Sequence, residues 1–208
     1  MLKTVSETVF EAFLRANGIR FEAVATTINK PGASRPDYIV ELTNQQVCCE
    51  IKELAPQPGS DAAPGIIKVR GSIIGDRIRR LIKRAKDQVR YGAERGYPTF
   101  LVIYNNDDPL QLFGTGPDDF MSAMYGSYTI QIGLKSGKAS PIYFGGQKSL
   151  TNEMNTSYSG LAHLSDRNGV ADLEIYENCF AKIPLAYESL PDCITATRFE
   201  PQLVAGMM

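Results

Sequence analysis

The sequence predicts an α/β protein, and three patterns carry this prediction. One amphipathic helical pattern lies near the N-terminus, a second and strongly basic one lies in the middle of the chain, and strand-like runs precede and follow the second. The chain has 208 residues, of which 43% are hydrophobic and 22% are charged. This length and composition are typical of a globular protein with one domain and additions, or with two very small domains.

Residues 4–17 are expected to form the first helix. Its apolar stripe consists of Val9, Phe10, Phe13 and Leu14. Thr4 and Glu7 have the spacing of a capping box, in which each side chain hydrogen-bonds the backbone N–H of the other residue. The pattern ends at Asn17-Gly18, a pair that commonly stops a helix.

Strand-like runs follow the first helix, and they cover residues 19–25, 38–42 and 46–54. The connection between the last two runs is short enough for a hairpin. The next stretch, residues 55–72, is rich in proline and glycine. We expect it to be a long loop, with a short strand at 66–69, and loops of this length in a compact domain are usually functional or mobile.

The basic pattern at residues 76–91 is expected to be the longest helix. Its apolar residues fall within one narrow arc and are Ile78, Leu81, Ile82, Ala85 and Val89. Residues 98–104 are almost continuously apolar, which is typical of a strand buried on both faces.

The last third of the chain has weaker patterns. We expect a helix over residues 117–123, because Pro117 and Asp118 are typical of a helix start. The other expected elements are hairpin strands at 128–134 and 141–144, a polar loop at 147–160, and two further strands at 160–165 and 172–176.

Charge and cysteine content exclude several classes of protein. The 22 basic and 23 acidic residues give a net charge of −1, which excludes a uniformly basic nucleic-acid coat but not a local basic face. The four cysteines, at 48, 49, 179 and 193, have no CxxC spacing, so a structural zinc site is poorly supported. We expect buried free thiols at Cys48 and Cys49 and a core position for His163, the single histidine.

The N-terminus begins with the amphipathic pattern and does not resemble a signal peptide. No apolar run approaches the ~20 residues that a membrane span needs. We therefore expect a cytoplasmic protein.

Three polar residues on the predicted hairpin have the character of a catalytic site. Strand alternation puts Glu50 and Lys52 on one face and Ile51 on the other. If the two runs pair as a hairpin, Asp37, at the start of the first, and Glu50 can converge near one end. Magnesium prefers hard oxygen ligands and keeps several waters, so two carboxylates suffice to hold it, and a nearby lysine can orient a water, help to deprotonate it, or neutralise phosphate charge.

Structural roles are the alternative for each of these residues. Asp37 follows a proline and suits the start of a strand without any catalytic role. Glu50 and Lys52 suit a solvated strand face with an ion pair. Glu53 points the opposite way along the strand, and we expect it to be a surface charge.

The segment Pro36-Asp37, twelve further residues and Glu50-Ile51-Lys52 together resemble the signature of the PD-(D/E)xK nuclease superfamily, which includes restriction endonucleases, Holliday-junction resolvases and recombination exonucleases. The resemblance covers residues 4–104. It implies a restriction-endonuclease-like mixed central sheet flanked by helices, with Asp37 and Glu50 as Mg²⁺ ligands and Lys52 as the catalytic lysine. It also implies a nuclease core over residues 1–108, and we expect residues 109–208 to be a β-rich C-terminal extension that completes the same domain.

Many members of that superfamily carry an additional acidic residue on the first helix. Glu7 and Glu11 are the candidates here. On a helical wheel Glu7 borders the apolar stripe and Glu11 points outward, so we expect Glu7 to serve the site. The alternative role for Glu7 is the capping box alone.

The helix at 76–91 carries seven cations on two ridges that flank its apolar arc, with two aspartates among them. Such a concentration could follow a phosphate backbone, although a charged run is more often a solvated face. Our candidates for nucleic-acid contact are Arg77, Arg80, Lys83, Arg84 and Gln88. Gln88 and Tyr91 are similar to a glutamine–tyrosine motif of the recombination-exonuclease branch, but the tyrosine is one residue early, and we expect it to be a packing residue.

These observations predict a nuclease that hydrolyses DNA phosphodiester bonds with Mg²⁺, or with Mn²⁺ in its place, in restriction, repair or recombination. A homodimer is compatible with this prediction. The first alternative is a non-catalytic nucleic-acid-binding module on the same fold. A structural or regulatory α/β domain without a nucleic-acid partner is the second.

Overall fold

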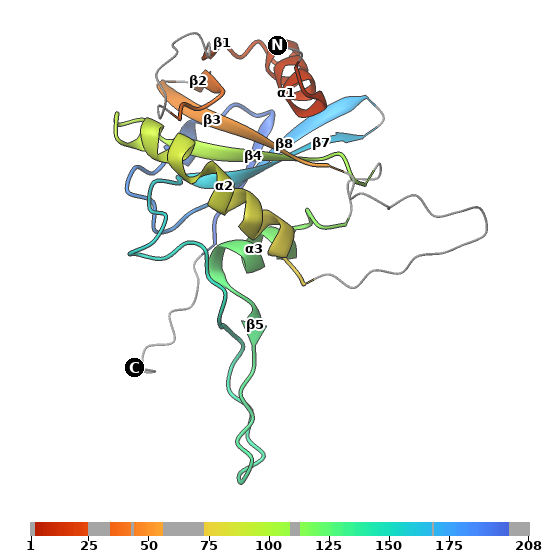
Figure 1. Ribbon diagram of the computed structural model, residues 1–208, viewed down its shortest axis with the longest axis vertical. Helices are drawn as coiled ribbons and strands as arrows, with labels where there is room; N and C mark the ends of the chain where they lie inside the picture. Colours follow the sequence, from red (N-terminus) through yellow and green to blue (C-terminus); the bar gives the residue numbers. More distant parts are fainter. Residues whose placement is uncertain are drawn as a thin grey trace, which may run out of the picture.

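A mixed seven-stranded sheet forms the centre of the protein, with helix α1 on one face and helices α2 and α3 on the other (Figure 1). The computed structural model describes residues 3–24, 34–42, 44–55, 73–108, 113–167 and 169–199. The strand order in the sheet is β1-β2-β3-β4-β7-β8-β9, and strands β5 and β6 form a separate pair. The α/β prediction is therefore confirmed.

The first half of the chain contributes the elements α1 (Val5–Ala16), β1 (Phe21–Ala23), β2 (Tyr38–Leu42), β3 (Gln45–Leu54), α2 (Asp76–Ala93) and β4 (Thr99–Asn105). Strands β1, β2 and β3 pair in antiparallel fashion, and β3 pairs with β4 in parallel. The predicted hairpin is thus present, and each of these elements begins and ends within about two residues of its predicted range. The strand predicted at 66–69 lies outside the described residues.

The second half contributes α3 (Pro117–Tyr125), β5 (Tyr128–Thr129), β6 (Tyr143–Phe144), β7 (Gly160–Arg167), β8 (Val170–Glu177), the 3₁₀ turn η1 (Tyr187–Ser189) and β9 (Ile194–Thr197). Strand β7 pairs with β4 in parallel, β8 pairs with β7 in antiparallel fashion, and β9 pairs with β8 in parallel. These three strands continue the sheet that the first half begins. Neither η1 nor β9 was expected from the sequence pattern.

Two hydrophobic clusters fix the helices to the sheet. On one face, Phe10, Phe13 and Leu14 of α1 pack with Val40 and Ile51 of the hairpin. The apolar arc of α2 packs on the other face, together with residues of β4, β7 and α3. Because side chains alternate along a strand, Glu50 and Lys52 lie on the α2 face.

The segment between α3 and β7 differs from its prediction. The hairpin formed by β5 and β6 projects from the body as a narrow arm (Figure 1). Its strands are shorter than predicted, and one further bridge joins Ile132 and Ala139. The segment predicted as a polar loop contains Leu150 and Tyr158, which are both fully buried, and the Tyr158 hydroxyl donates to the Ile82 carbonyl oxygen at 2.6 Å. This segment therefore covers part of α2.

Cys48 and Cys49 are buried free thiols, as predicted, and Cys179 and Cys193 are also unpaired. Among the described residues, no helix combines the length and the apolar character that crossing a membrane requires.

Helix α2 approaches strand β3 most closely at Gly92. A Cβ atom at this position would lie 2.6 Å from Thr99 Oγ1 and 2.9 Å from the Cβ of Cys48. Real Cβ atoms do not approach other atoms so closely, so only glycine fits here without a shift of the helix.

We expect Gly92→Ala to destabilise the protein, since overpacking costs about 1–3 kcal/mol and alanine regains at most about 1 kcal/mol in helix propensity. Urea unfolding measures the difference. Gly146→Ala is the matched control, because its Cβ meets nothing within 4 Å, and its stability should stay within about 0.5 kcal/mol of the wild type. Equal stability of the two variants would contradict the close approach.

His163 lies in the core of the sheet on β7, with 7% of its surface exposed. Its core position is confirmed. Its buried Nε2 has no hydrogen-bond partner among the described residues. Its ring lies 5.6 Å from that of Phe120, and burial lowers the pKa of His163 to about 4.

We expect acidification to destabilise the protein through His163. The unfolded chain takes up a proton near pH 6.5 and the folded protein only near pH 4, so stability is lost as the pH falls through this window. The loss should reach about 2 kcal/mol at pH 5. Urea unfolding at pH 7.5 and pH 5 measures it, and His163→Gln, which does not titrate, should show a pH dependence that is smaller by this amount.

Candidate active site

The register of the β2–β3 hairpin brings Asp37 next to Glu50. Tyr38 pairs with Cys49, so Asp37, one residue before β2, lies opposite Glu50. Asp37 Oδ2 accepts a hydrogen bond of 2.8 Å from the Ile51 backbone N–H. This side-chain contact lies one residue beyond the last backbone pair of β2 and β3, and it fixes the Asp37 carboxylate beside β3.

Glu50 is almost completely buried, with 1% of its surface exposed. Its Oε1 forms an ion pair with Lys52 Nζ, and about a quarter of the Lys52 side chain is exposed. Its Oε2 is buried and has no hydrogen-bond partner among the described residues. A buried carboxylate oxygen without a partner is unfavourable, so this atom points to a missing ligand or a functional role.

The electrostatics of the two acids confirm that they lie close together. Burial raises the pKa of Glu50 to about 7, and the Asp37 carboxyl adds to this effect while Lys52 opposes it. Burial also raises the pKa of Asp37, against the hydrogen bond from Ile51 and the charge of Lys52. A buried acid and a half-buried acid therefore lie near one ammonium group.

This donor set fits a hard divalent cation. Asp37 and Glu50 supply carboxylate oxygens, and the unpartnered Oε2 of Glu50 gains a ligand when a cation binds. No group of three or more His, Cys, Asp or Glu residues with metal-site geometry occurs in the described part of the chain. Mg²⁺ keeps several waters and takes substrate oxygens, so two carboxylates are sufficient protein ligands for it.

Glu7 forms the capping box and also lies near Asp37. Its capping box with Thr4 is present: Glu7 Oε2 accepts from the Thr4 backbone N–H at 2.7 Å, and Thr4 Oγ1 accepts from the Glu7 N–H at 3.2 Å. The charge of Glu7 also contributes to the raised pKa of Asp37, which places the carboxylate within electrostatic range of the site.

Glu11 does not point outward, so that expectation is wrong. It is buried and forms ion pairs with Lys3 at 2.6 Å and Arg15 at 2.5 Å, and it accepts a hydrogen bond from the Tyr38 hydroxyl at 3.0 Å. Burial by itself raises the pKa of Glu11, but these three partners outweigh it and lower the pKa. Glu11 therefore fixes α1 to β2, and its charge is already balanced.

Glu53 is not a free surface charge either. It is half-buried on the α1 face of β3, and it accepts hydrogen bonds from the Ser6 backbone N–H at 3.2 Å and from Asn106 Nδ2 at 2.8 Å. It therefore joins the first turn of α1 to the end of β4.

The cations of α2 are more extensively paired than the sequence indicates. Arg77 forms an ion pair of 2.6 Å with Asp107, Arg80 lies 3.8 Å from Asp76, and Arg90 lies 2.7 Å from Asp87. Three of the seven cations thus have acidic partners in these pairs. Asp107 comes from beyond the helix, so the composition of α2 alone does not reveal it.

Three predicted nucleic-acid contacts remain accessible. Lys83 and Arg84 are exposed and form no ion pair with any residue that the structure describes, and Gln88 is half-buried. Lys83 lies on the same ridge as Arg79, whose guanidinium donates to the Ser122 carbonyl oxygen of α3 at 2.8 Å. This ridge faces α3.

The other ridge faces the hairpin. Near its start, Arg77 reaches the Ala55 carbonyl oxygen just after β3. At its end, the Tyr91 ring lies under Arg35, just before β2. Arg80, Arg84 and Gln88 lie between these points, on the side of α2 nearest to Asp37 and Glu50.

Sequence reasoning gave no functional role to Arg35, Tyr91 and Arg95. The Arg95 guanidinium lies 3.4 Å from the centroid of the Tyr91 ring, and that of Arg35 lies 5.7 Å from it. Tyr91 is half-buried, and its ring packs against these two guanidinium groups. The feature of the sequence that could have pointed to a functional role is the position of Arg35, two residues before Asp37.

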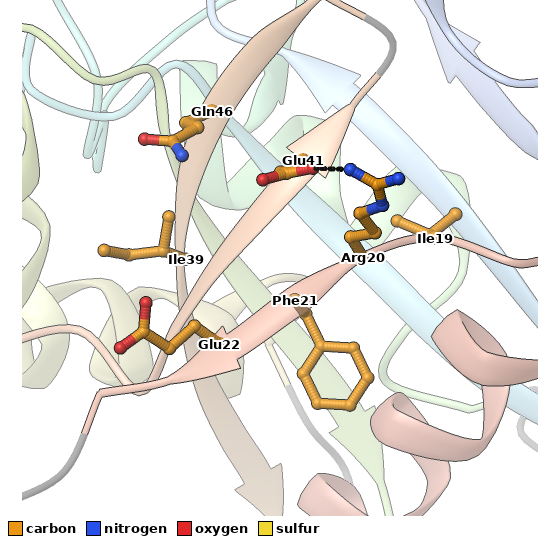
Figure 2. Close-up of a pocket in the computed structure, with 7 residues that line it drawn as sticks. All are labelled: Ile19, Arg20, Phe21, Glu22, Ile39, Glu41 and Gln46. Atoms are coloured by element: carbon orange, nitrogen blue, oxygen red, sulfur yellow. Dashed lines mark ion pairs between the residues drawn. The ribbon is translucent and has the colours of Figure 1, made fainter.

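A groove of about 490 Å³ lies on the outer strands of the sheet, and Figure 2 shows the seven residues that line it. Ile39 and Glu41 of β2, Gln46 of β3 and Glu22 of β1 contribute to it. Its ion pair, between Arg20 and Glu41 at 3.7 Å, is marked in the figure. The groove contains none of the three predicted catalytic residues.

Comparison of the chain with protein-family models, curated proteins and solved structures finds no significant match.

We expect Glu50→Gln to stabilise the protein at alkaline pH when no divalent cation is present. Because the pKa of Glu50 is about 7 in the folded protein and 4.5 in the unfolded chain, the wild type loses stability as the pH rises through this range. The variant avoids this loss, which amounts to about 2–3 kcal/mol at pH 8.

Urea unfolding in a chelator at pH 5 and pH 8 measures the effect. Glu41→Gln is the control, since Glu41 is about half exposed on the neighbouring strand. A Glu50→Gln protein less stable than the wild type at pH 8 would show that the Lys52 ion pair outweighs the burial of the charge.

Proposed function

We propose that this protein is a metal-dependent nuclease that hydrolyses phosphodiester bonds of DNA. The observation that carries the proposal is the convergence of Asp37, Glu50 and Lys52 on two paired strands, with Glu50 Oε2 buried and unpartnered. This combination of two acids and an ammonium group is suited to a Mg²⁺-assisted attack of water on a phosphodiester.

The order of elements supports the same proposal. A helix, three antiparallel strands, a second helix and a parallel strand follow one another in α1-β1-β2-β3-α2-β4. This is the order that the resemblance to the PD-(D/E)xK superfamily implies, and we propose a restriction-endonuclease-like fold on this basis.

Asp37 and Glu50 would hold the ion, which when bound lowers the pKa of a water and stabilises the negative charge that develops on phosphate. Asp37 is held in position by the Ile51 N–H, which leaves other lone pairs of its carboxylate for an ion. Glu50 Oε2, which has no partner among the described residues, would gain one in the ion. Glu7 is within electrostatic range of Asp37 and adds negative charge beside the ion.

Lys52 is the group that orients the attacking water. Its ammonium contacts Glu50, and the side chain is partly exposed, so it can face both the carboxylates and an incoming phosphate. Once a cation shares the charge of Glu50, Lys52 is free to orient the attacking water and to neutralise the phosphate.

The α2 ridge beside the site supplies phosphate contacts. Arg80 and Arg84 are exposed, and Gln88 lies on the same ridge. Arg77 reaches the same side but is held by Asp107, so it contributes less. Lys83 faces α3 and would contact only a nucleic acid that extends across the helix.

The second candidate is a non-catalytic nucleic-acid-binding module. One observation favours it: Lys52 already neutralises Glu50 without a cation. In that case the acids and the lysine serve only the structure, and the basic helix alone accounts for the function.

We expect the wild type to cleave DNA in Mg²⁺ or Mn²⁺ and not in a chelator. Asp37→Asn, Glu50→Gln and Lys52→Ala should each lower the rate by about 10²-fold or more, because each removes a metal ligand or the group that handles the water. A cleavage panel of linear, circular, single-stranded and branched DNA measures this.

Glu41→Gln is the matched control and should cleave at the wild-type rate, since this acid on β2 lies outside the site. A second readout is independent of activity: Mg²⁺ should raise the melting temperature of the wild type but not of the Asp37 and Glu50 variants. Salt-sensitive DNA binding without cleavage or a Mg²⁺ effect would support the binding module.

A further inference from the structure

Arg35, Tyr91 and Arg95 form a cation–aromatic cluster beside the candidate site. Both guanidinium groups lie over the Tyr91 ring, with Arg95 in close contact at 3.4 Å and Arg35 at 5.7 Å from its centroid. Arg95 is further fixed by a hydrogen bond of 2.9 Å from Nη1 to the Tyr91 carbonyl oxygen. The two guanidinium carbons therefore lie no more than about 9 Å apart, which is the sum of these two distances.

The positive charge of this cluster is not balanced. In the part of the chain that the structure describes, neither arginine forms an ion pair, in contrast with Arg77 and Arg90 of α2. Two guanidinium groups held close together repel each other, and an anion bound to both relieves this repulsion. Arginine presents its donors in a planar fork that matches two phosphate oxygens, so phosphate is the anion that this arrangement fits best.

The location of the cluster connects it with the metal site. Arg35 lies two residues before Asp37 in the sequence. Gly92, next to Tyr91, packs directly on Cys48, and the charge of Arg95 acts on the Cys48 thiol. Cys48 precedes Glu50 by two residues on the same face of β3.

This spacing can be compared with that of a nucleic acid. Two residues of a strand span about 7 Å. Consecutive phosphates of one DNA strand advance by about 3.4 Å along the helix axis and lie further apart than this along the winding backbone. A phosphate at the cluster would thus lie within about two nucleotides of the bond at the metal site.

We propose that Arg35 and Arg95 bind one backbone phosphate of a DNA strand, within about two nucleotides of the bond to be cleaved, with Tyr91 between the two arginines. The proposal rests on the proposed nuclease function and adds the residues that position the strand along β3.

Binding of a fluorescently labelled DNA duplex, measured by anisotropy in a chelator at several salt concentrations, tests the proposal without cleavage. Arg35→Ala/Arg95→Ala should weaken binding about 10-fold or more and reduce the slope of log affinity against log salt by about 1, as expected for one lost phosphate contact. Arg35→Lys/Arg95→Lys should keep the wild-type slope but bind several-fold more weakly, because it keeps the charges and loses the forks.

Arg167→Ala/Lys182→Ala is the matched control. It removes two exposed cations outside the cluster, near the β7–β8 strands, and should leave affinity within about 2-fold and the slope unchanged. Urea unfolding of each variant checks that it is folded. If the cluster variant binds like the wild type, or if the control weakens binding equally, the proposal is overturned.

Titration with a deoxynucleoside monophosphate separates the two sources of phosphate. Binding of this nucleotide as tightly as the duplex, lost in the cluster variant, would assign the site to a free nucleotide and overturn the proposal. The proposed nuclease function is read separately, from cleavage in Mg²⁺. Cleavage by the wild type with unaltered binding of the cluster variant removes the phosphate site alone, while cluster-dependent binding without cleavage removes the nuclease function alone.

Discussion

The burial of Glu50 beside Asp37 is the interaction on which the rest of the candidate site depends. The β2–β3 register places the two carboxyl groups together, and the Ile51 N–H holds one of them in place. Helix α2 and the elements packed around it exclude water from the other. The result is a folded protein that holds an acid in an environment where its charged form is unfavourable, which is a common property of functional sites.

The parts of this arrangement that follow local rules could be predicted from the sequence. Strand alternation and a short connection were sufficient to bring Asp37, Glu50 and Lys52 together, because a hairpin joins residues that are close in sequence. The partners of Glu11, Glu53 and Arg77 could not be predicted, since Tyr38, Asn106 and Asp107 come from other elements. Strand β9 was missed because its four residues are too short to establish a pattern and depend on β8 for pairing.

Helix α2 makes a different contact on each of three sides. Its apolar arc packs on the sheet, and its Arg79 ridge is joined to α3 by hydrogen bonds. The third side, which ends at Tyr91, borders the hairpin. A helical wheel finds the apolar arc and both ridges, but only the fold determines which ridge borders the acids.

Because Gly92 has no side chain, this residue affects the distance between α2 and the strand that carries Glu50. Here the last turn of α2 rests on Cys48 and Thr99 with no side chain of its own between them, so contact between backbone and neighbouring strand sets the helix position. The distance between the main chain of this turn, which carries Tyr91, and the strand that carries Glu50 is therefore set by the backbone at Gly92. Rotamer changes at the surface leave this distance unchanged, and a single methyl group at this turn would increase it.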